Sequence, residues 1–139
     1  MNNYDLNILS HHEFEQLTRD LLQKKFDAFI ESFTTGKDNG IDLRFGFSED
    51  KKYIVQCKRY ATFTSLMSSL KKELKSIKSL KFEKYFLATS LGLTPNQKEK
   101  IKQLLNPYIA DCENIFGKDD LNNILSVHKD IELKYYKLW

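Results

Sequence analysis

The stretch that decides the fold is IDLRFGFSEDKKYIVQCK, residues 41–58. Its two halves, 41–47 and 53–57, are rich in the β-branched and aromatic residues that strands favour. The polar residues between them are typical of a turn. We therefore predict an antiparallel hairpin that turns about Asp50, with Asp42 opposite Lys58 and Arg44 opposite Gln56.

Helix and strand patterns continue on both sides of this hairpin. Ser10 with Glu13 and Thr94 with Gln97 have the form of capping boxes, which mark the starts of two helices. Apolar residues spaced three or four apart indicate the helix interiors. The elements predicted outside the hairpin are a helix over 11–25, a short strand over 29–33, a loop over 34–40, a helix over 63–80, a strand over 85–89, a helix over 94–105, a strand over 114–116, a helix capped by Asp119 or Asp120 and a helical segment over 129–138. This order predicts a three-layer α/β domain, with a central mixed sheet flanked by helices.

Length and composition indicate one ordinary globular domain over residues 1–139. No apolar run approaches the length of a membrane span, so we expect a cytoplasmic protein with no membrane partner. The cysteines, Cys57 and Cys112, lack the spacing of a zinc site and are interpreted as reduced thiols. Residues 135–139 are four large apolar or aromatic residues in five, an unusual chain end. We therefore expect 126–139 to be a helical segment leading into a longer protein.

The hairpin also groups polar side chains. Period-two alternation puts Gln56 and Lys58 on one face beside Asp42, and Val55 and Cys57 on the other face. A carboxylate and an amide oxygen on central strands lose hydration, a cost that a metal site would explain. Asp42, the Gln56 side-chain carbonyl and the Cys57 peptide carbonyl are oxygen ligands suited to Mg²⁺, and Lys58 would orient or deprotonate the attacking water. The same spacing also fits a simple cross-strand ion pair between Asp42 and Lys58, with Gln56 half exposed.

The net charge of +3 is mild, but lysines are concentrated between 71 and 84. They form either a solvated helix face or a surface that binds the phosphate backbone of double-stranded DNA without regard to sequence. The residues of such a surface would be Arg59, Lys71, Lys72, Lys75 and Lys78. His11 and His12 are adjacent and face different directions on a helix, so they cannot jointly bind a metal and are interpreted as surface residues.

Two motifs together resemble a known family. The segment GKDNGIDL at 36–43, followed by VQCKRY at 55–60, is similar to the Mrr-like restriction endonucleases of the PD-(D/E)xK nuclease superfamily. Phe14-Glu15 looks like the family's first helix, and the likeness covers about 10–125. It implies the restriction-endonuclease-like fold.

The resemblance also implies a function, namely metal-dependent cleavage of DNA. Asp42 and Gln56 would hold Mg²⁺, which Mn²⁺ can replace, Lys58 would activate or position the water, and Glu15 would join as a further acidic ligand. Gln56 stands where the wider superfamily has an acidic residue, which should weaken metal affinity. A catalytically silent DNA-binding or oligomerisation module of the same fold and a Holliday-junction resolvase are the alternatives.

A second resemblance concerns 115–122 and 136–139. These segments look like the region that joins an N-terminal Mrr-like nuclease to a STAND-type NTPase in bacterial antiviral defence proteins. The resemblance implies an anti-phage effector with little sequence specificity, which forms a homo-oligomer through the NTPase region.

Overall fold

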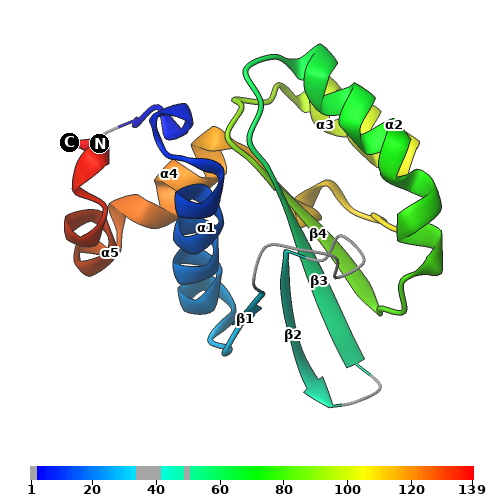
Figure 1. The fold of residues 1–139 in the computed structure, drawn as a ribbon, viewed down its shortest axis with the longest axis horizontal. Coiled ribbons are helices and arrows are strands. Elements are labelled where there is room, and N and C mark those ends of the chain that lie inside the picture. The colour runs from blue at the N-terminus through cyan, green and yellow to red at the C-terminus, as the bar shows by residue number, and fades with distance from the viewer. Residues whose placement is uncertain (1–2, 34–41, 49–50) are drawn as a thin grey trace.

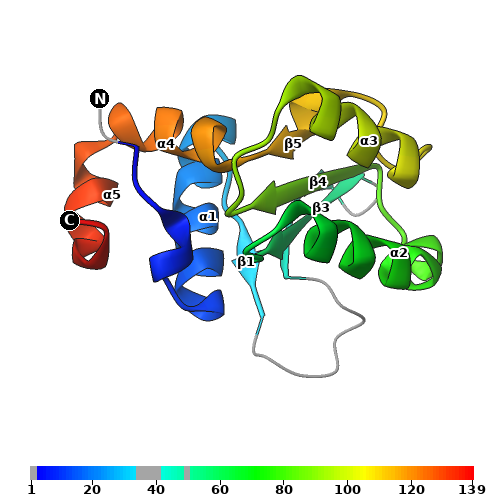
Figure 2. The ribbon, with the colours of Figure 1, turned by 90° about the horizontal axis from the view of Figure 1, so that it is seen from above.

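A mixed sheet stands between two groups of helices (Figures 1 and 2). The computed structural model describes residues 3–33, 42–48 and 51–139. Its helices are α1 (His11–Phe26), α2 (Phe63–Ser79), α3 (Pro95–Leu105), α4 (Lys118–Ser126) and α5 (Lys129–Lys134), with short 3-10 turns η1 (Leu6–Ile8), η2 (Cys112–Asn114) and η3 (Tyr136–Leu138). Its strands are β1 (Glu31–Ser32), β2 (Leu43–Ser48), β3 (Lys51–Lys58), β4 (Lys84–Thr89) and β5 (Ile115–Phe116).

The strand order is β1-β2-β3-β4-β5, antiparallel from β1 to β3 and parallel from β3 to β5. Helices α2 and α3 connect the parallel strands and cover one face of the sheet, while α1 and α4 cover the other, with α5 beyond them (Figure 2). The predicted three-layer α/β fold with a mixed sheet is therefore confirmed.

Each face of the sheet has its own hydrophobic core. On one side, Phe14, Leu17 and Leu21 of α1 are fully buried together with Val55 and Cys57 of β3. On the other side, Ile54 of β3 packs with buried leucines and isoleucines of α2 and α3. The sheet between them is covered on both faces, and the polar residues Gln56 and Lys58 near the end of β3 are buried.

The hairpin forms as predicted, but its predicted register is wrong by two residues. Leu43 lies opposite Val55 and Arg44 opposite Ile54, so Asp42, the residue before Leu43, lies beside Gln56 and not opposite Lys58. A register shift between Gly46 and Ser48, a β-bulge in β2 that alternation of residue types does not reveal, accounts for one of the two residues. The other is already present where Ser48 lies opposite Lys51. The predicted loop at 34–40 and the turn centre at Asp50 lie outside the described residues.

The start of α4 is a second difference. The helix begins at Lys118 with Gly117 as N-cap, two residues before the nearer of the predicted caps. The Asp120 carboxylate accepts a hydrogen bond from the Gly117 N–H at 2.8 Å. Asp120 therefore caps the helix from a position inside its first turn, and not as the N-cap residue. Both capping boxes expected for α1 and α3 are present.

The C-terminal segment is anchored to α1. Lys134 Nζ and Tyr135 Oη both donate to the Asp20 carboxylate, at 2.9 and 2.6 Å, and Lys137 Nζ donates to Glu13 at 2.9 Å. Apolar side chains of the same segment are buried in the core that α1 shares with the sheet. The outer surface of α1 is thus covered by the C-terminal segment, which comes after the last strand in the sequence.

Candidate active site

The site lies where the N-terminal half of α1 meets the start of β2 and the end of β3. A cavity of about 360 Å³ opens here. It is lined by His11, Asp42, Cys57, Lys58, Arg59, Tyr60 and Glu73. The predicted residues Asp42 and Lys58 therefore share one cavity, to which α1 contributes His11 and α2 contributes Glu73.

Asp42 is held by two hydrogen bonds to β3. Its Oδ2 accepts from the Cys57 N–H at 2.8 Å, and its own N–H donates to Gln56 Oε1 at 2.9 Å. Gln56 is only 3% exposed. The alternative of a simple ion pair between Asp42 and Lys58 predicted that Gln56 would be half exposed. Its amide oxygen, which we expected to bind a metal, accepts the hydrogen bond from the main chain of Asp42. Because an amide oxygen has two lone pairs, this hydrogen bond leaves one lone pair for a metal. The Cys57 carbonyl points to the same side as the Cys57 N–H, as in any strand, and so faces Asp42.

Glu15 brings a second carboxylate to Asp42. It is 7% exposed, because it sits on the buried face of α1 among core leucines. Burial raises the pKa of Asp42 to about 7, and the charge of Glu15 with a hydrogen bond between the two side chains adds to the rise. The Cys57 N–H and the charge of Lys58 act in the opposite direction. Two carboxyl groups so placed cannot both be ionised at low cost unless a cation joins them.

His11 completes this group. It is exposed, as expected of a surface residue, but it lies next to Glu15 and not apart from the site. Its Nε2 lies 2.8 Å from Glu15 Oε1, one helical turn along α1. One ligand atom each from His11, Glu15 and Asp42 all lie within 4.8 Å of one another. The sequence did contain a signal for this contact, because His11 and Glu15 are four residues apart and so lie on the same side of a helix. The sequence analysis compared His11 only with the adjacent His12.

Lys58 makes an ion pair with Glu73 of α2, not with Asp42. The lysine is 8% exposed, so its ammonium group is held inside the cavity by a partner that the sequence analysis did not single out. Among the described residues, the second carboxylate oxygen of Glu73 is buried without a hydrogen-bond partner. The sequence analysis did not identify Glu73, because the other charged residues of its helix are all lysines.

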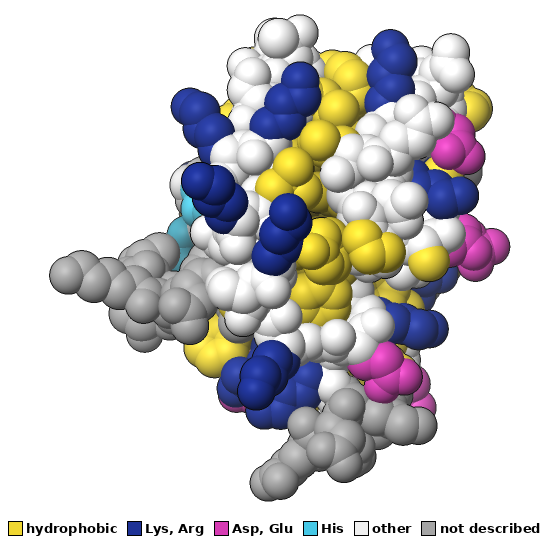
Figure 3. Space-filling model, turned by 90° about the vertical axis from the view of Figure 1, so that its right-hand side faces the viewer, with side chains coloured by type: hydrophobic (Ala, Val, Ile, Leu, Met, Phe, Trp, Pro, Cys, Tyr) yellow, Lys and Arg dark blue, Asp and Glu magenta, His cyan; other side chains and the backbone are white. Residues whose placement is uncertain are grey.

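The lysines proposed to bind DNA are all exposed on α2. Helical spacing puts Lys71, Lys75 and Lys78 on the side of α2 opposite Glu73, and Figure 3 shows basic side chains spread over this face of the molecule. Arg59 differs, because its guanidinium donates to the carbonyls of Leu9 and Asn7. It ties the end of β3 to the N-terminal segment.

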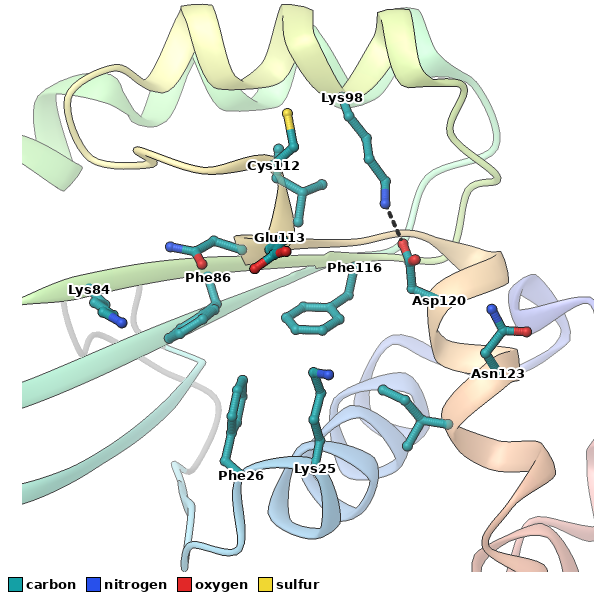
Figure 4. A pocket seen from close by; sticks show the side chains of 13 residues that line it. Lys25, Phe26, Lys84, Phe86, Lys98, Cys112, Glu113, Phe116, Asp120 and Asn123 are labelled. Carbon is teal, nitrogen blue, oxygen red and sulfur yellow. Dashed lines mark hydrogen bonds and ion pairs between the residues drawn. The ribbon is translucent and has the colours of Figure 1, made fainter.

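A larger cavity, of about 720 Å³, lies at the β5 edge (Figure 4). Its walls include Phe26, Phe86 and Phe116, and an ion pair of 2.7 Å joins Lys98 to Asp120 at one end. None of the predicted catalytic residues lines it. The smaller cavity, with its converging carboxylates and lysine, is therefore the better candidate for chemistry.

A five-stranded mixed sheet flanked by helices on both faces is the architecture of the restriction-endonuclease-like class of domains. The restriction endonuclease family of the Mrr catalytic type matches residues 6–114, and the chain belongs to that family. The family resemblance is therefore confirmed.

Among known proteins, the chain is 36% identical over 138 residues to the uncharacterised protein y4cD of Sinorhizobium fredii (strain NBRC 101917 / NGR234). The alignment covers 98% of this chain but 21% of that protein, so the chain spans about a fifth of its relative's length. No solved structure matches the chain. Within the described residues, no helix is both long and apolar enough to cross a membrane.

Proposed function

We propose that this domain is a metal-dependent DNA endonuclease that hydrolyses phosphodiester bonds at the cavity around Asp42. The observation that carries the proposal is the convergence of Asp42 and Glu15 beside Lys58. Family membership supports a nuclease activity on DNA.

The residues present fit a divalent metal. Two carboxylates share a buried position where like charges repel, and the donor set also offers the Cys57 carbonyl and the Gln56 amide oxygen. The unpaired oxygen of Glu73 lies in the same cavity wall. Asp42, Glu15, Gln56 and the Cys57 carbonyl would hold the ion, Mg²⁺ or Mn²⁺. When bound, such an ion neutralises charge that builds up on the phosphate and eases deprotonation of water.

The protein's own residues supply orientation and further charge. Gln56 and the Cys57 N–H fix the Asp42 carboxylate, so that it does not have to be ordered when the substrate arrives. Lys58 has hydrogen-bond donors only, and its position against Glu73 directs them into the cavity. We infer that Lys58 orients the attacking water and stabilises the phosphate oxygens as the bond to the leaving oxygen breaks.

The test is cleavage of supercoiled plasmid by purified protein with Mg²⁺, with Mn²⁺ and with EDTA. We expect nicking and linearisation with metal, none with EDTA, and loss of cleavage in Asp42→Ala and Lys58→Ala. Equal cleavage by all three proteins would refute the site. No cleavage by any of them, with intact DNA binding, would favour the silent module of the same fold.

We further propose that the basic face of α2 binds DNA phosphates that flank the cleaved bond. Replacing Lys71 and Lys75 with alanine should then flatten the dependence of binding on salt, by about 0.9 in the log–log slope for each phosphate that is no longer neutralised. The measurement is fluorescence anisotropy with duplex DNA across a salt series. The matched control is Lys24→Ala with Lys129→Ala, two exposed lysines in the opposite helical layer. An identical slope change in both double variants would contradict a specific role for α2.

The wider role proposed is that of an effector in a longer antiviral protein, where an attached NTPase assembles several copies on DNA. The length of y4cD supports the idea that this domain occurs within larger chains. Sedimentation of the full-length protein with and without ATP tests it, and a monomer under both conditions would contradict it.

A further inference from the structure

We propose that His11 is a nitrogen ligand of the same metal site and that it shifts the site's preference from Mg²⁺ toward first-row transition-metal dications. This inference rests on the proposed function, because it assumes that Asp42 and Glu15 hold a metal.

The geometry places the imidazole beside both carboxylates. His11 and Glu15 are four residues apart on α1, so they project from the same side of the helix, and Nε2 reaches Glu15 Oε1 at 2.8 Å. All three ligand atoms fit within 4.8 Å, whereas opposite ligands of a six-coordinate ion at about 2.1 Å are roughly 4 Å apart. Only one pair of the three can be opposite, and adjacent ligands of such an ion are roughly 3 Å apart, so a contraction of at most about 2 Å would let one ion contact all three.

The three proposed ligands differ in how exposed they are, and this difference would give a metal ion a path into the site. The Glu15 side chain is 10% exposed and that of His11 is 53% exposed, so the carboxylates lie inside and the imidazole stands at the mouth of the cavity. An exposed imidazole can rotate toward an incoming ion without disturbing the core of α1. His12, the next residue, is also exposed but does not belong to the group.

Ligand chemistry then predicts the choice of metal. Mg²⁺ prefers oxygen ligands, and carboxylate charge contributes much of the affinity of a site for such hard cations. Gln56 leaves this site with a neutral ligand where the wider superfamily has an acid, which penalises Mg²⁺. An imidazole nitrogen adds affinity for transition-metal dications without adding charge. His11 thus offsets what Gln56 removes, but only for those ions.

The experiment uses Mn²⁺ alone as the probe, with electron paramagnetic resonance as the readout. Titration gives the amount of bound Mn²⁺, and electron spin echo modulation detects a directly coordinated ¹⁴N. We expect nitrogen modulation in the wild type and in His12→Ala, and its loss in His11→Ala and His11→Gln. The affinity for Mn²⁺ should fall about 10–100-fold in the His11 variants, the scale typical of substitutions around a metal site. Displacement by Mg²⁺ should show its affinity changed less than about threefold, because Mg²⁺ gains little from an imidazole.

The outcomes separate this inference from the function on which it rests. Mn²⁺ binding that needs Asp42 but shows no nitrogen modulation, or an equal loss in His11→Ala and His12→Ala, overturns the role of His11 and leaves the endonuclease proposal intact. Mn²⁺ binding that survives Asp42→Ala overturns both. Melting curves in EDTA check that each variant is folded, and His11→Gln keeps a side chain that can hydrogen-bond Glu15.

Discussion

Asp42→Asn is expected to abolish DNA cleavage and, in metal-free protein at pH 8, to raise the melting temperature. The loss of activity should be about 10³-fold or more, since a metal supplies several kcal/mol of transition-state stabilisation. The gain in stability follows from the burial of Asp42 beside Glu15, which raises the pKa of Asp42 to about 7. Asparagine keeps an oxygen that can accept from the Cys57 N–H and removes the charge.

The sign of the pH dependence follows from proton uptake by the two states. Below about pH 4 the Asp42 carboxyl is protonated whether the chain is folded or not, and it has no effect on stability. As the pH rises from there toward 7, the unfolded chain loses this proton first, so the folded protein loses stability. Above pH 7 the penalty is complete and is on the order of 4 kcal/mol at most.

Melting curves in EDTA at several pH values therefore test this prediction. The advantage of Asp42→Asn should be roughly 5–15 °C at pH 8 and should shrink toward zero near pH 4. Added Mn²⁺ should stabilise the wild type and not the variant. If Asp42→Asn melted at or below the melting temperature of the wild type at pH 8, the charge of Asp42 beside Glu15 would not destabilise the folded protein.

Lys58→Met is expected to lower the rate of cleavage by about 10²–10⁴-fold, the range for a group that positions or transfers a proton. Metal binding should persist, because Lys58 lies beside the carboxylates without being a ligand. Glu73→Gln should cost less, about tenfold, since it loosens Lys58 without removing it. The double variant should be no slower than Lys58→Met, because both changes act through one side chain.

Single-turnover cleavage of a labelled duplex gives these rates, and Mn²⁺ titration gives the affinity. The matched control is Glu83→Gln, an exposed acid near the start of β4. If Glu73→Gln slowed cleavage as much as Lys58→Met while Lys58 was present, Glu73 would have a role of its own at the site. If the two effects simply multiplied in the double variant, Glu73 would not act through Lys58.

Local sequence signals predicted the elements of the fold well, because capping boxes and apolar periodicity are properties of neighbouring residues. The starts of α1 and α3 follow directly from Ser10 and Thr94 with their box partners. The register of the hairpin was wrong in part because a bulge between Gly46 and Ser48 leaves no signal in residue type. That one-residue irregularity accounts for one of the two residues by which the predicted cross-strand neighbour of Asp42 was displaced.

The candidate site was less accessible to sequence reasoning, because its members meet through tertiary packing. Glu15 was suggested by family resemblance and not by any local pattern. His11 was set aside through comparison with His12, although its relevant neighbour was one turn further along α1. Lys58 was predicted opposite Asp42, with an ion pair between the two as one alternative, yet α2 brings Glu73 to Lys58 from fifteen residues downstream. This ion pair depends on how the helix packs on the sheet.

The anchoring of the C-terminal segment bears on where the functional unit ends. The family match stops at residue 114, yet Leu121, Leu125 and Ile131 complete the core around α1, and Asp20 is bonded to both Lys134 and Tyr135. A recombinant fragment cut at the matched boundary would leave the helix that carries Glu15 without its outer support. We therefore expect the unit that folds cooperatively to extend past the family's sequence boundary, and expression trials should include the residues up to the end of this core.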